Sequence, residues 1–448
     1  MDVVQSGISN VLAYAVLAIV VGLIAFDCRR DLRQLVSARN VFLITILAWY
    51  LLEAIGVPPE ISKYTQEEYN FSLIAVLLCC FSFLIGYSIS KGGIFDSSFR
   101  RIAGIDRPKL IWGIFLFAVG LGFLPLIVIA KGNLMLIFDD AFASGNRWSS
   151  PFQRGRFGGA RDAFLELQLF LRAALPLAAA ILAHPKQSSG RRLFAAAFLV
   201  YMIARALNDG TRSKVLEALM PLAAACYWRM SPALKRKAIA FGLPCIAVLG
   251  LFWAAAAVSG RNAGTTNWET ATEVNYVGFE MFRELLYLER MIPEFSEHKF
   301  GHTYYVQLVN PIPRFLWPGK PSGDAGLELA GMRDSVNNGA DLTISPGLIG
   351  EMHWNGGLIG IFLVSAFMGY LAKSWDRIRP MATQSLLAFT IFATGLAIIF
   401  LSGRSISMPV LYGIIAILVL LMFFAKPRKR ATSVRVNQTR FVQDSQTN

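Results

Sequence analysis

Eleven apolar segments run along this chain of 448 residues, and they limit the folds that are open to it. A helix needs about 20 mostly apolar residues to cross a bilayer. The segments are 7–26, 41–57, 71–88, 110–130, 163–183, 193–207, 215–227, 238–259, 347–372, 382–401 and 408–425. We therefore expect an all-α polytopic membrane protein with about 11 transmembrane helices.

Two of the segments, 193–207 and 215–227, are short, and Asn208-Asp209-Gly210 forms a tight break between them. They form either two short spans or one re-entrant pair. The composition agrees with a membrane protein, because 16% of the residues are charged, whereas a soluble chain has about 25%. Disordered, collagen-like and disulfide-rich secreted chains are excluded.

Positive charge is concentrated on alternate connections between the segments. Those connections hold 25 Lys and Arg against 6 Asp and Glu, whereas the opposite connections hold 16 against 19. Because basic loops stay in the cytoplasm, we expect the N-terminus outside and the C-terminus inside. Membrane orientation thus accounts for the net charge of +14, and we expect no nucleic-acid partner.

A single transmembrane domain is expected over 1–425, followed by a basic, disordered cytoplasmic tail over 426–448. Two outer loops, 131–162 and 260–346, are longer than connectors need to be. Within the second loop, apolar residues recur at helical spacing over 269–292 and predict an amphipathic helix. That helix either packs on the rim of the membrane domain or lies beside an entrance for a lipid substrate.

Six ionisable residues fall inside the predicted spans, where charge is costly and usually marks function. They are Glu53, Glu166, Arg172, Arg205, Glu217 and Glu351. With the orientation above, five of them lie within about two turns of the outer surface, and Arg172 lies deepest. This distribution predicts a cavity that opens outward, whereas a transporter more often has its polar site at the midplane.

Cations also occur on short outer connections, where the orientation rule disfavours them. Arg212 lies in one such hairpin and Arg404 in another. The planar guanidinium group suits phosphate oxygens, so both residues are candidates for binding an anion. The alternative is an interfacial ion pair with Glu217 or Glu351.

The segment before the ninth span is rich in residues suited to a binding site. Four prolines should keep Pro311–Pro321 extended as a stiff strap. The strap carries two cations, Arg314 and Lys320, and two flat apolar side chains on which sugar rings could stack, Phe315 and Trp317.

The ninth span opens with Glu351 and His353 near its outer end. Gly356, Gly357 and Gly360 follow and predict close helix packing. The sequence has no Walker A loop, Gly-rich dinucleotide fingerprint, zinc-protease motif or Asp-x-Asp pair, and no cysteine spacing typical of a metal site. We therefore expect neither a nucleotide cofactor nor a metal ion.

At these residues the chain resembles bacterial O-antigen and oligosaccharide repeat-unit polymerases of the Wzy type. The resemblance covers roughly 205–425 and rests on motifs in a fixed order. These are a Gly-Thr-Arg hairpin, a large outer loop, a PRxxWPxKP strap, a Gly-Glu…Trp-Asn-Gly-Gly span opening and an outer Arg between the last two spans. The N-terminal half is similar in its span pattern alone.

The resemblance implies an enzyme of the bacterial inner membrane. It would transfer a glycan from undecaprenyl diphosphate onto the next lipid-linked repeat unit at the outer, periplasmic face, in O-antigen or exopolysaccharide synthesis. This reaction needs no metal and no cofactor. The resemblance also implies membrane lipid around the protein and two protein partners, a chain-length regulator and a flippase.

The same resemblance assigns roles by position. Glu351 is the first choice for the catalytic base, with His353 and His302 as alternatives. Diphosphate binding falls to Arg212, Arg404, Arg314, Lys320, Arg205 and Arg172, binding of the second substrate to Arg154, Arg156 and Arg161, and sugar stacking to Trp317 and Phe315.

Two alternative functions stay open. An O-antigen ligase, a relative with the same layout, would move the glycan to a lipid A core. A flippase or transporter would move the lipid-linked sugar across the membrane and predicts charged groups along a path through both leaflets. The inner halves of the predicted spans are apolar, which favours an enzyme at the outer face.

Overall fold

The structure is a computed structural model, and it describes residues 9–56, 61–105, 107–142, 164–208, 212–237, 281–292, 296–309, 312, 316–321, 328–329, 332 and 345–406. Every regular element within these residues is a helix, so the expected all-α fold is confirmed there.

The long helices are α1 (Val11–Cys28), α4 (Gln66–Ile89), α6 (Pro108–Ile129), α9 (Leu169–Ala183), α10 (Ser189–Asn208), α11 (Arg212–Arg229), α18 (Leu348–Arg377) and α20 (Leu386–Ser402), and another runs from α2 (Ala38–Ile46) through a π-helical turn (Leu47–Leu51) into α3 (Leu52–Gly56). The short ones are η1 (Leu32–Val36), η3 (Ile61–Lys63), α5 (Asp96–Ala103), α7 (Leu134–Phe142), η5 (Glu166–Gln168), α12 (Pro232–Lys237), α15 (Met281–Met291), α16 (His302–Val309) and α19 (Arg379–Ala382).

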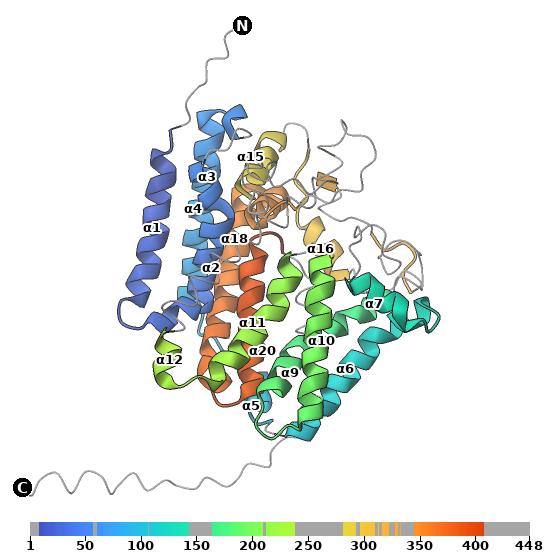
Figure 1. Ribbon diagram of the computed structural model, residues 1–448. Coiled ribbons are helices and arrows are strands. Elements are labelled where there is room, and N and C mark those ends of the chain that lie inside the picture. Colours follow the sequence, from blue (N-terminus) through green and yellow to red (C-terminus); the bar gives the residue numbers. More distant parts are fainter. Residues whose placement is uncertain are drawn as a thin grey trace, which may run out of the picture.

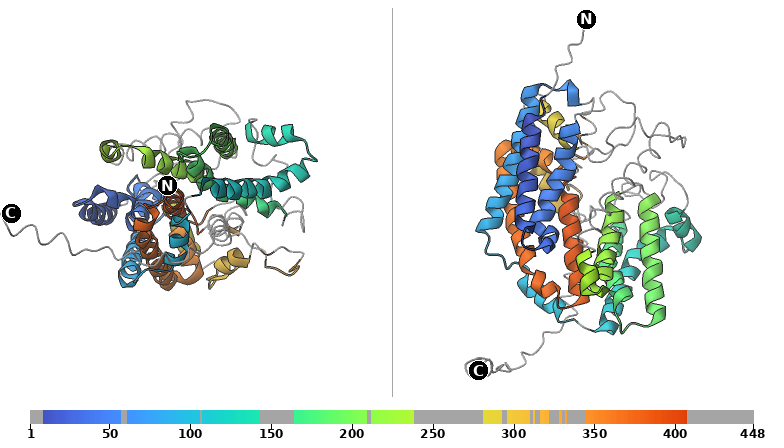
Figure 2. Two further views of the ribbon diagram at one scale, coloured as in Figure 1. Left: turned by 90° about the horizontal axis from the view of Figure 1, so that it is seen from below. Right: turned by 60° about the vertical axis from the view of Figure 1, so that its left-hand side comes forward.

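The long helices stand side by side in two groups (Figure 1). One group holds α2 to α4 with α18, the other holds α6 with α9, α10 and α11, and α20 packs against members of both (Figure 2). Helices α15 and α16 lie toward one end of the bundle, which we call the site end. Helices α5 and α12 lie toward the opposite end, which we call the basic end.

Five helical stretches are long and apolar enough to cross a membrane: Val11–Cys28, Ala38–Gly56, Gln66–Ile89, Pro108–Ile129 and Leu348–Ala382. Two shorter helices, α9 and α20, are also apolar. These features are compatible with a multi-pass membrane protein. The structure has helices in nine of the eleven predicted segments, with α10 and α11 separate, and the remaining two, 238–259 and 408–425, lie outside the described residues.

Helices α4 and α18 share the most extensive contact within the described part of the chain. A Cβ atom at Gly86 would lie 1.8 Å from the carbonyl oxygen of Ala366, and one at Gly369 would lie 2.0 Å from that of Phe83. Because backbone oxygens cannot swing aside, glycine alone allows the two helices to approach this closely. The glycines thus fix the position of α18, whose first turn carries Glu351.

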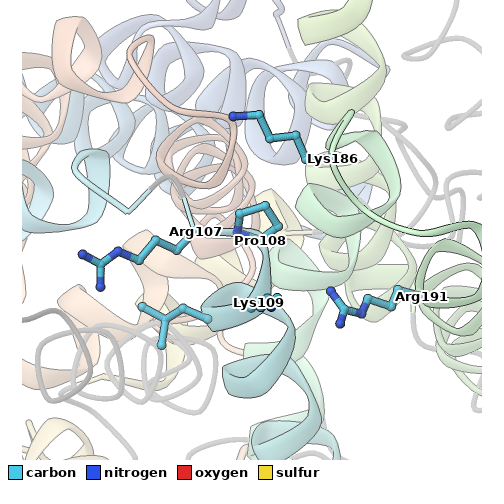
Figure 3. A pocket seen from close by; sticks show the side chains of 6 residues that line it. Arg107, Pro108, Lys109, Lys186 and Arg191 are labelled. Carbon is cyan, nitrogen blue, oxygen red and sulfur yellow. The ribbon is translucent and has the colours of Figure 1, made fainter.

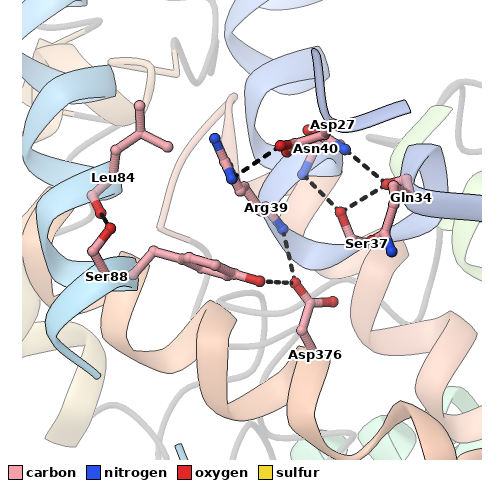
Figure 4. A network of polar contacts seen from close by, with 9 residues as sticks. Asp27, Gln34, Ser37, Arg39, Asn40, Leu84, Ser88 and Asp376 are labelled. Carbon is pink, nitrogen blue, oxygen red and sulfur yellow. Dashed lines mark hydrogen bonds and ion pairs between the residues drawn. The ribbon is translucent and has the colours of Figure 1, made fainter. Parts of the chain in front are cut away.

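At the basic end, Asp376 of α18 contacts the start of α2 (Figure 4). Its carboxylate accepts hydrogen bonds from the N–H groups of Ala38 (2.7 Å) and Arg39 (3.3 Å). It also accepts one from the hydroxyl of Tyr87 on α4 (2.9 Å), and Arg39 pairs with Asp27 of α1 (3.1 Å). The first N–H groups of a helix lack acceptors within that helix. Asp376 supplies acceptor oxygens for two of these groups in α2 from another helix, α18.

Asp376→Ala is expected to destabilise the protein by about 3 kcal/mol, because it leaves two partly buried N–H groups without an acceptor. Asp376→Asn keeps one acceptor oxygen and should cost less. The measurement is the melting temperature of the purified protein in detergent. Asp139→Ala, at an exposed position on α7, is the control and should melt like the wild type; an equally unchanged Asp376→Ala would contradict the expectation.

At the site end, α15 is the described part of the amphipathic helix predicted over 269–292, and the rest of that segment lies outside the described residues. It packs against α3, α4 and α18, as expected for a helix on the rim of the membrane domain. Glu53 accepts hydrogen bonds from the N–H groups of Phe282 (2.8 Å) and Arg283 (3.2 Å). This glutamate, expected among the charges of an open cavity, therefore binds the first turn of α15.

The second half of α15 is held by two further contacts. The hydroxyl of Ser72 donates to Glu289 (2.8 Å), and Arg290 donates to both carboxylate oxygens of Glu68 (2.6 and 2.7 Å). Burial raises the pKa of Glu289 to about 7, since the hydrogen bond from Ser72 offsets the loss of solvation only in part.

We expect α15 to dock less firmly as the pH rises. The pKa of Glu289 in the folded protein, about 7, lies above its ordinary value of 4.5, so between these values the folded state binds more protons and its stability falls with pH. Because Glu289 is only partly buried, solvent limits the effect to about 1 kcal/mol. Limited proteolysis near α15 should be faster at about pH 8 than at about pH 5.5. Glu289→Gln should abolish the difference; a difference that persists belongs to another group.

Candidate functional site

Glu351 lies buried in the first turn of α18. Its carboxylate accepts hydrogen bonds from the hydroxyl of Thr303 (3.1 Å), the side-chain amide of Gln307 (3.0 Å) and the N–H group of Ile406 (3.1 Å). Thr303 and Gln307 belong to α16, and Ile406 follows α20. One carboxylate thus joins α18, the middle of the long outer loop and the segment that carries Arg404.

Asn355 extends this contact by one helical turn. Its amide nitrogen donates to the hydroxyl of Thr303 (2.6 Å) and to the carbonyl oxygen of Glu351 (2.7 Å). Glu351 and Asn355 are four residues apart on α18, and Thr303 and Gln307 are four residues apart on α16. The two pairs therefore face each other. The roles of Thr303, Gln307 and Asn355 are missed by sequence reasoning; the signal for them is this four-residue spacing of polar side chains in apolar helices.

The start of α18 is fixed against the end of α20. The N–H group of Leu348 and the hydroxyl of Tyr50 both donate to the carbonyl oxygen of Gly403 (3.0 and 3.1 Å), and the same hydroxyl accepts from the N–H group of Ile349 (2.9 Å). Gly347 has a φ of 73°, and a Cβ there would lie 2.8 Å from the Tyr50 hydroxyl. This position therefore requires glycine for its backbone angle and for its space.

Below its first two turns, α18 is interrupted at Gly356 and Gly357. Gly357 has φ 57° and ψ −147°, a conformation that is essentially restricted to glycine. A Cβ at Gly356 would meet no atom within 4 Å, and one at Gly357 would lie 3.5 Å from the ring of His298, which is in a loop. Neither glycine packs against a neighbouring helix, so the expected close helix packing at these two glycines is wrong. They bend α18 instead, and a Cβ at Gly360 would lie 2.5 Å from the carbonyl oxygen of Met352 in the same helix.

The two histidines predicted as alternative bases occupy different surroundings. His353 is buried and lies about 200° around the helix from Glu351. Its ring centroid is 6.1 Å from that of Phe71 and 5.9 Å from that of His298, and its Nδ1 makes no hydrogen bond within the described residues. His302 is exposed at the first residue of α16. Neither histidine donates any of the three hydrogen bonds to the Glu351 carboxylate that are described above.

Two of the predicted diphosphate-binding arginines have acidic neighbours. Arg172 of α9 pairs with Glu217 of α11 (3.5 Å). Arg205 of α10 pairs with Asp140 of α7 (3.7 Å) and donates to Gln168 (2.9 Å). These contacts tie α7, α9, α10 and α11 together, and a diphosphate would compete with the carboxylates for both cations.

Arg212 and Arg404 lie at the same end of two neighbouring helices. Arg212 begins α11, and its side chain lies outside the described residues. Arg404 follows α20, is half-buried, and its carbonyl oxygen accepts a hydrogen bond from the hydroxyl of Ser345. Because α11 packs along α20, the structure brings both positions to the site end.

The predicted strap, Pro311–Pro321, is described in part. The N–H group of Lys320 donates to the carbonyl oxygen of Trp317 (3.0 Å), so this part forms a turn and the expected extended chain is wrong here. The buried ammonium group of Lys320 donates to the carbonyl oxygen of Ile312 (3.0 Å), and Trp317 is half-buried. The predicted residues Arg314, Phe315, Arg154, Arg156 and Arg161 lie outside the described residues.

Comparison with family models, with curated proteins and with solved structures finds no match to this chain. The family resemblance therefore rests on the sequence motifs. Within the part of the chain that the structure describes, no group of three or more His, Cys, Asp or Glu side chains is placed to hold a metal ion. Chemically, the site is a buried carboxylate beside an arginine-bearing loop, an arrangement that can orient a hydroxyl group and accept its proton.

Proposed function

We propose that this chain is a metal-independent glycosyltransferase that polymerises oligosaccharide repeat units carried on undecaprenyl diphosphate. The reaction takes place at the periplasmic face of the bacterial inner membrane, in O-antigen or exopolysaccharide synthesis. The observation that carries the proposal is the position of Glu351, where α18, α16 and the segment with Arg404 meet. Three parts of the resemblance, the long outer loop, the Gly-Glu span opening and the segment after α20, thus meet at Glu351.

In this proposal the site end faces the periplasm and the basic end faces the cytoplasm. The connections with excess Lys and Arg include those around α5 and α12, which lie toward the basic end (Figure 1). The positive-inside rule places such connections in the cytoplasm. The distribution of charge therefore supports the proposed orientation.

The proposed reaction is a single displacement. A hydroxyl group of the acceptor repeat unit attacks the anomeric carbon of the donor glycan, the bond from that carbon to the diphosphate oxygen breaks, and the hydroxyl proton passes to a base. The anomeric configuration inverts. Negative charge grows on the leaving diphosphate, where fixed cations lower the barrier, and Arg212 and Arg404 at the site end fit this requirement.

Glu351 is the first candidate for the base. A general base must come within hydrogen-bonding distance of the hydroxyl group that it deprotonates. Thr303 and Gln307 donate to its Oε1, and the N–H group of Ile406 donates to its Oε2. The hydroxyl group of the acceptor would be a further donor to this carboxylate. His302, exposed on α16, and His353, which faces α4, are the alternatives.

The test uses the purified full-length protein in detergent with a purified undecaprenyl-diphosphate repeat unit, without nucleotide or metal. A ladder of lengthening products on a gel is the expected result. Transfer to a lipid A core without a ladder would indicate the ligase. Movement of the lipid across liposome bilayers without any transfer would replace the enzyme with a transporter. A chain-length regulator and a flippase are the protein partners that this function implies.

A further inference from the structure

A hollow at the basic end lies between the start of α6 and the turn that joins α9 to α10 (Figure 3). Its volume is about 490 Å³, and it is lined by Arg107, Pro108, Lys109, Leu110, Lys186 and Arg191. Four of these residues are cations, and they come from two segments far apart in the sequence. The proposed reaction at the opposite end of the bundle gives them no role.

These four cations form no ion pair within the described part of the chain. Other cations at the basic end do, since Arg39 pairs with Asp27 (3.1 Å) and Arg377 with Asp96 (3.2 Å). Positive charge that is not held in an ion pair attracts anions more strongly than charge that is already compensated. The hollow, where four such cations from two segments meet, is therefore a candidate anion site.

Hydrogen bonds hold the walls of the hollow together. The buried side chain of Gln187 donates to the carbonyl oxygen of Pro108 (2.8 Å) and accepts from Arg191 (3.3 Å). The guanidinium group of Arg191 also lies 5.6 Å from the centre of the Trp112 ring. Helix α6, 22 residues long, begins at this wall without a side-chain cap, and the free N–H groups of a helix start favour an anion.

Apolar surface adjoins the cations. Pro108 and Leu110 line the hollow, and Leu193 and Phe194, on the turn of α10 that follows Arg191, are exposed. A ligand that satisfies both surfaces carries phosphate next to hydrocarbon. We propose that the hollow binds the phosphate headgroup of an anionic phospholipid from the surrounding bilayer. A soluble phosphate compound shares the headgroup chemistry but leaves the apolar surface uncovered.

The test measures lipid retained by the full-length protein after extraction from liposomes of equal phosphatidylglycerol and phosphatidylethanolamine, by native mass spectrometry. The hollow variant combines Arg107→Gln, Lys109→Gln, Lys186→Gln and Arg191→Gln. The control variant combines Arg29→Gln, Arg30→Gln, Arg100→Gln and Arg101→Gln, which removes the same charge from exposed positions. Wild type and control should retain phosphatidylglycerol, and the hollow variant should retain at least about tenfold less.

Any of four results would overturn the proposal. Equal losses in both variants would show general attraction to a basic surface, and equal retention of phosphatidylethanolamine would show no preference for anionic lipid. Displacement of the bound lipid by inorganic phosphate would assign the hollow to a soluble anion. Melting temperatures show whether the variants fold. If the hollow variant does not fold, Lys186→Gln and Arg191→Gln are tested singly, and each should reduce the retention of phosphatidylglycerol. Unchanged retention in both single variants would also overturn the proposal.

Discussion

Gly369→Ala is expected to prevent α18 from docking on α4. The added Cβ would lie 2.0 Å from the carbonyl oxygen of Phe83 and 2.8 Å from the backbone nitrogen of Tyr87. Both atoms belong to a helix backbone that cannot rotate away, so the helices must separate along their contact. The expected destabilisation is at least about 3 kcal/mol. It would be measured as a lower melting temperature in detergent and a smaller monodisperse peak in size-exclusion chromatography.

Gly120→Ala on α6 makes the same chemical change where a Cβ meets no atom within 4 Å. Alanine there should be neutral or stabilising by about 0.5–1 kcal/mol, since glycine weakens helices. Gly86→Ala brings a Cβ to 1.8 Å from the Ala366 carbonyl oxygen and should behave like Gly369→Ala. Similar melting of Gly369→Ala and Gly120→Ala would show that α4 and α18 are not in such close contact.

The long helices could be predicted because apolar length is a property of each segment by itself. Their ends depend on finer interactions. Helix α4 starts at Gln66, before the predicted 71, because the Thr65 hydroxyl accepts the N–H group of Glu68 while the Glu68 carboxylate accepts that of Thr65. This reciprocal cap lies outside the apolar run, so hydropathy alone does not reveal it.

The candidate site could be predicted in part. A carboxylate at the start of an apolar span needs partners, which singled out Glu351. The partners themselves, Thr303, Gln307 and Ile406, lie 44 to 55 residues away in sequence and reach it through tertiary packing. Glu53 has the same signature in the sequence but binds the first turn of α15, so an acid within a span does not by itself distinguish a site from a helix cap.

The second large effect is expected at Glu351. Glu351→Gln keeps the volume of the side chain but turns one acceptor oxygen into an NH₂ group that faces a donor. As the proposed base, Glu351 cannot be replaced by an amide, so ladder formation should fall at least about 100-fold. Glu351→Ala also leaves Thr303, Gln307 and the N–H group of Ile406 without this acceptor, and should cost about 1–3 kcal/mol for each buried donor left unsatisfied.

The comparison of Glu351→Gln with Gln307→Leu separates a base from an anchor. Gln307→Leu removes one hydrogen bond between α16 and α18 but leaves the carboxylate in place. Glu351→Gln turns into a donor either Oε1, which accepts from Thr303 and Gln307, or Oε2, which accepts from Ile406. If Glu351 is the base, Glu351→Gln should lose far more activity than its change in melting temperature explains. In Gln307→Leu, activity and melting temperature should fall in proportion to each other. If both variants lost activity only in proportion to stability, Glu351 would be a positioning residue. The proton would then pass to His302 or His353, and His302→Ala and His353→Ala would show which.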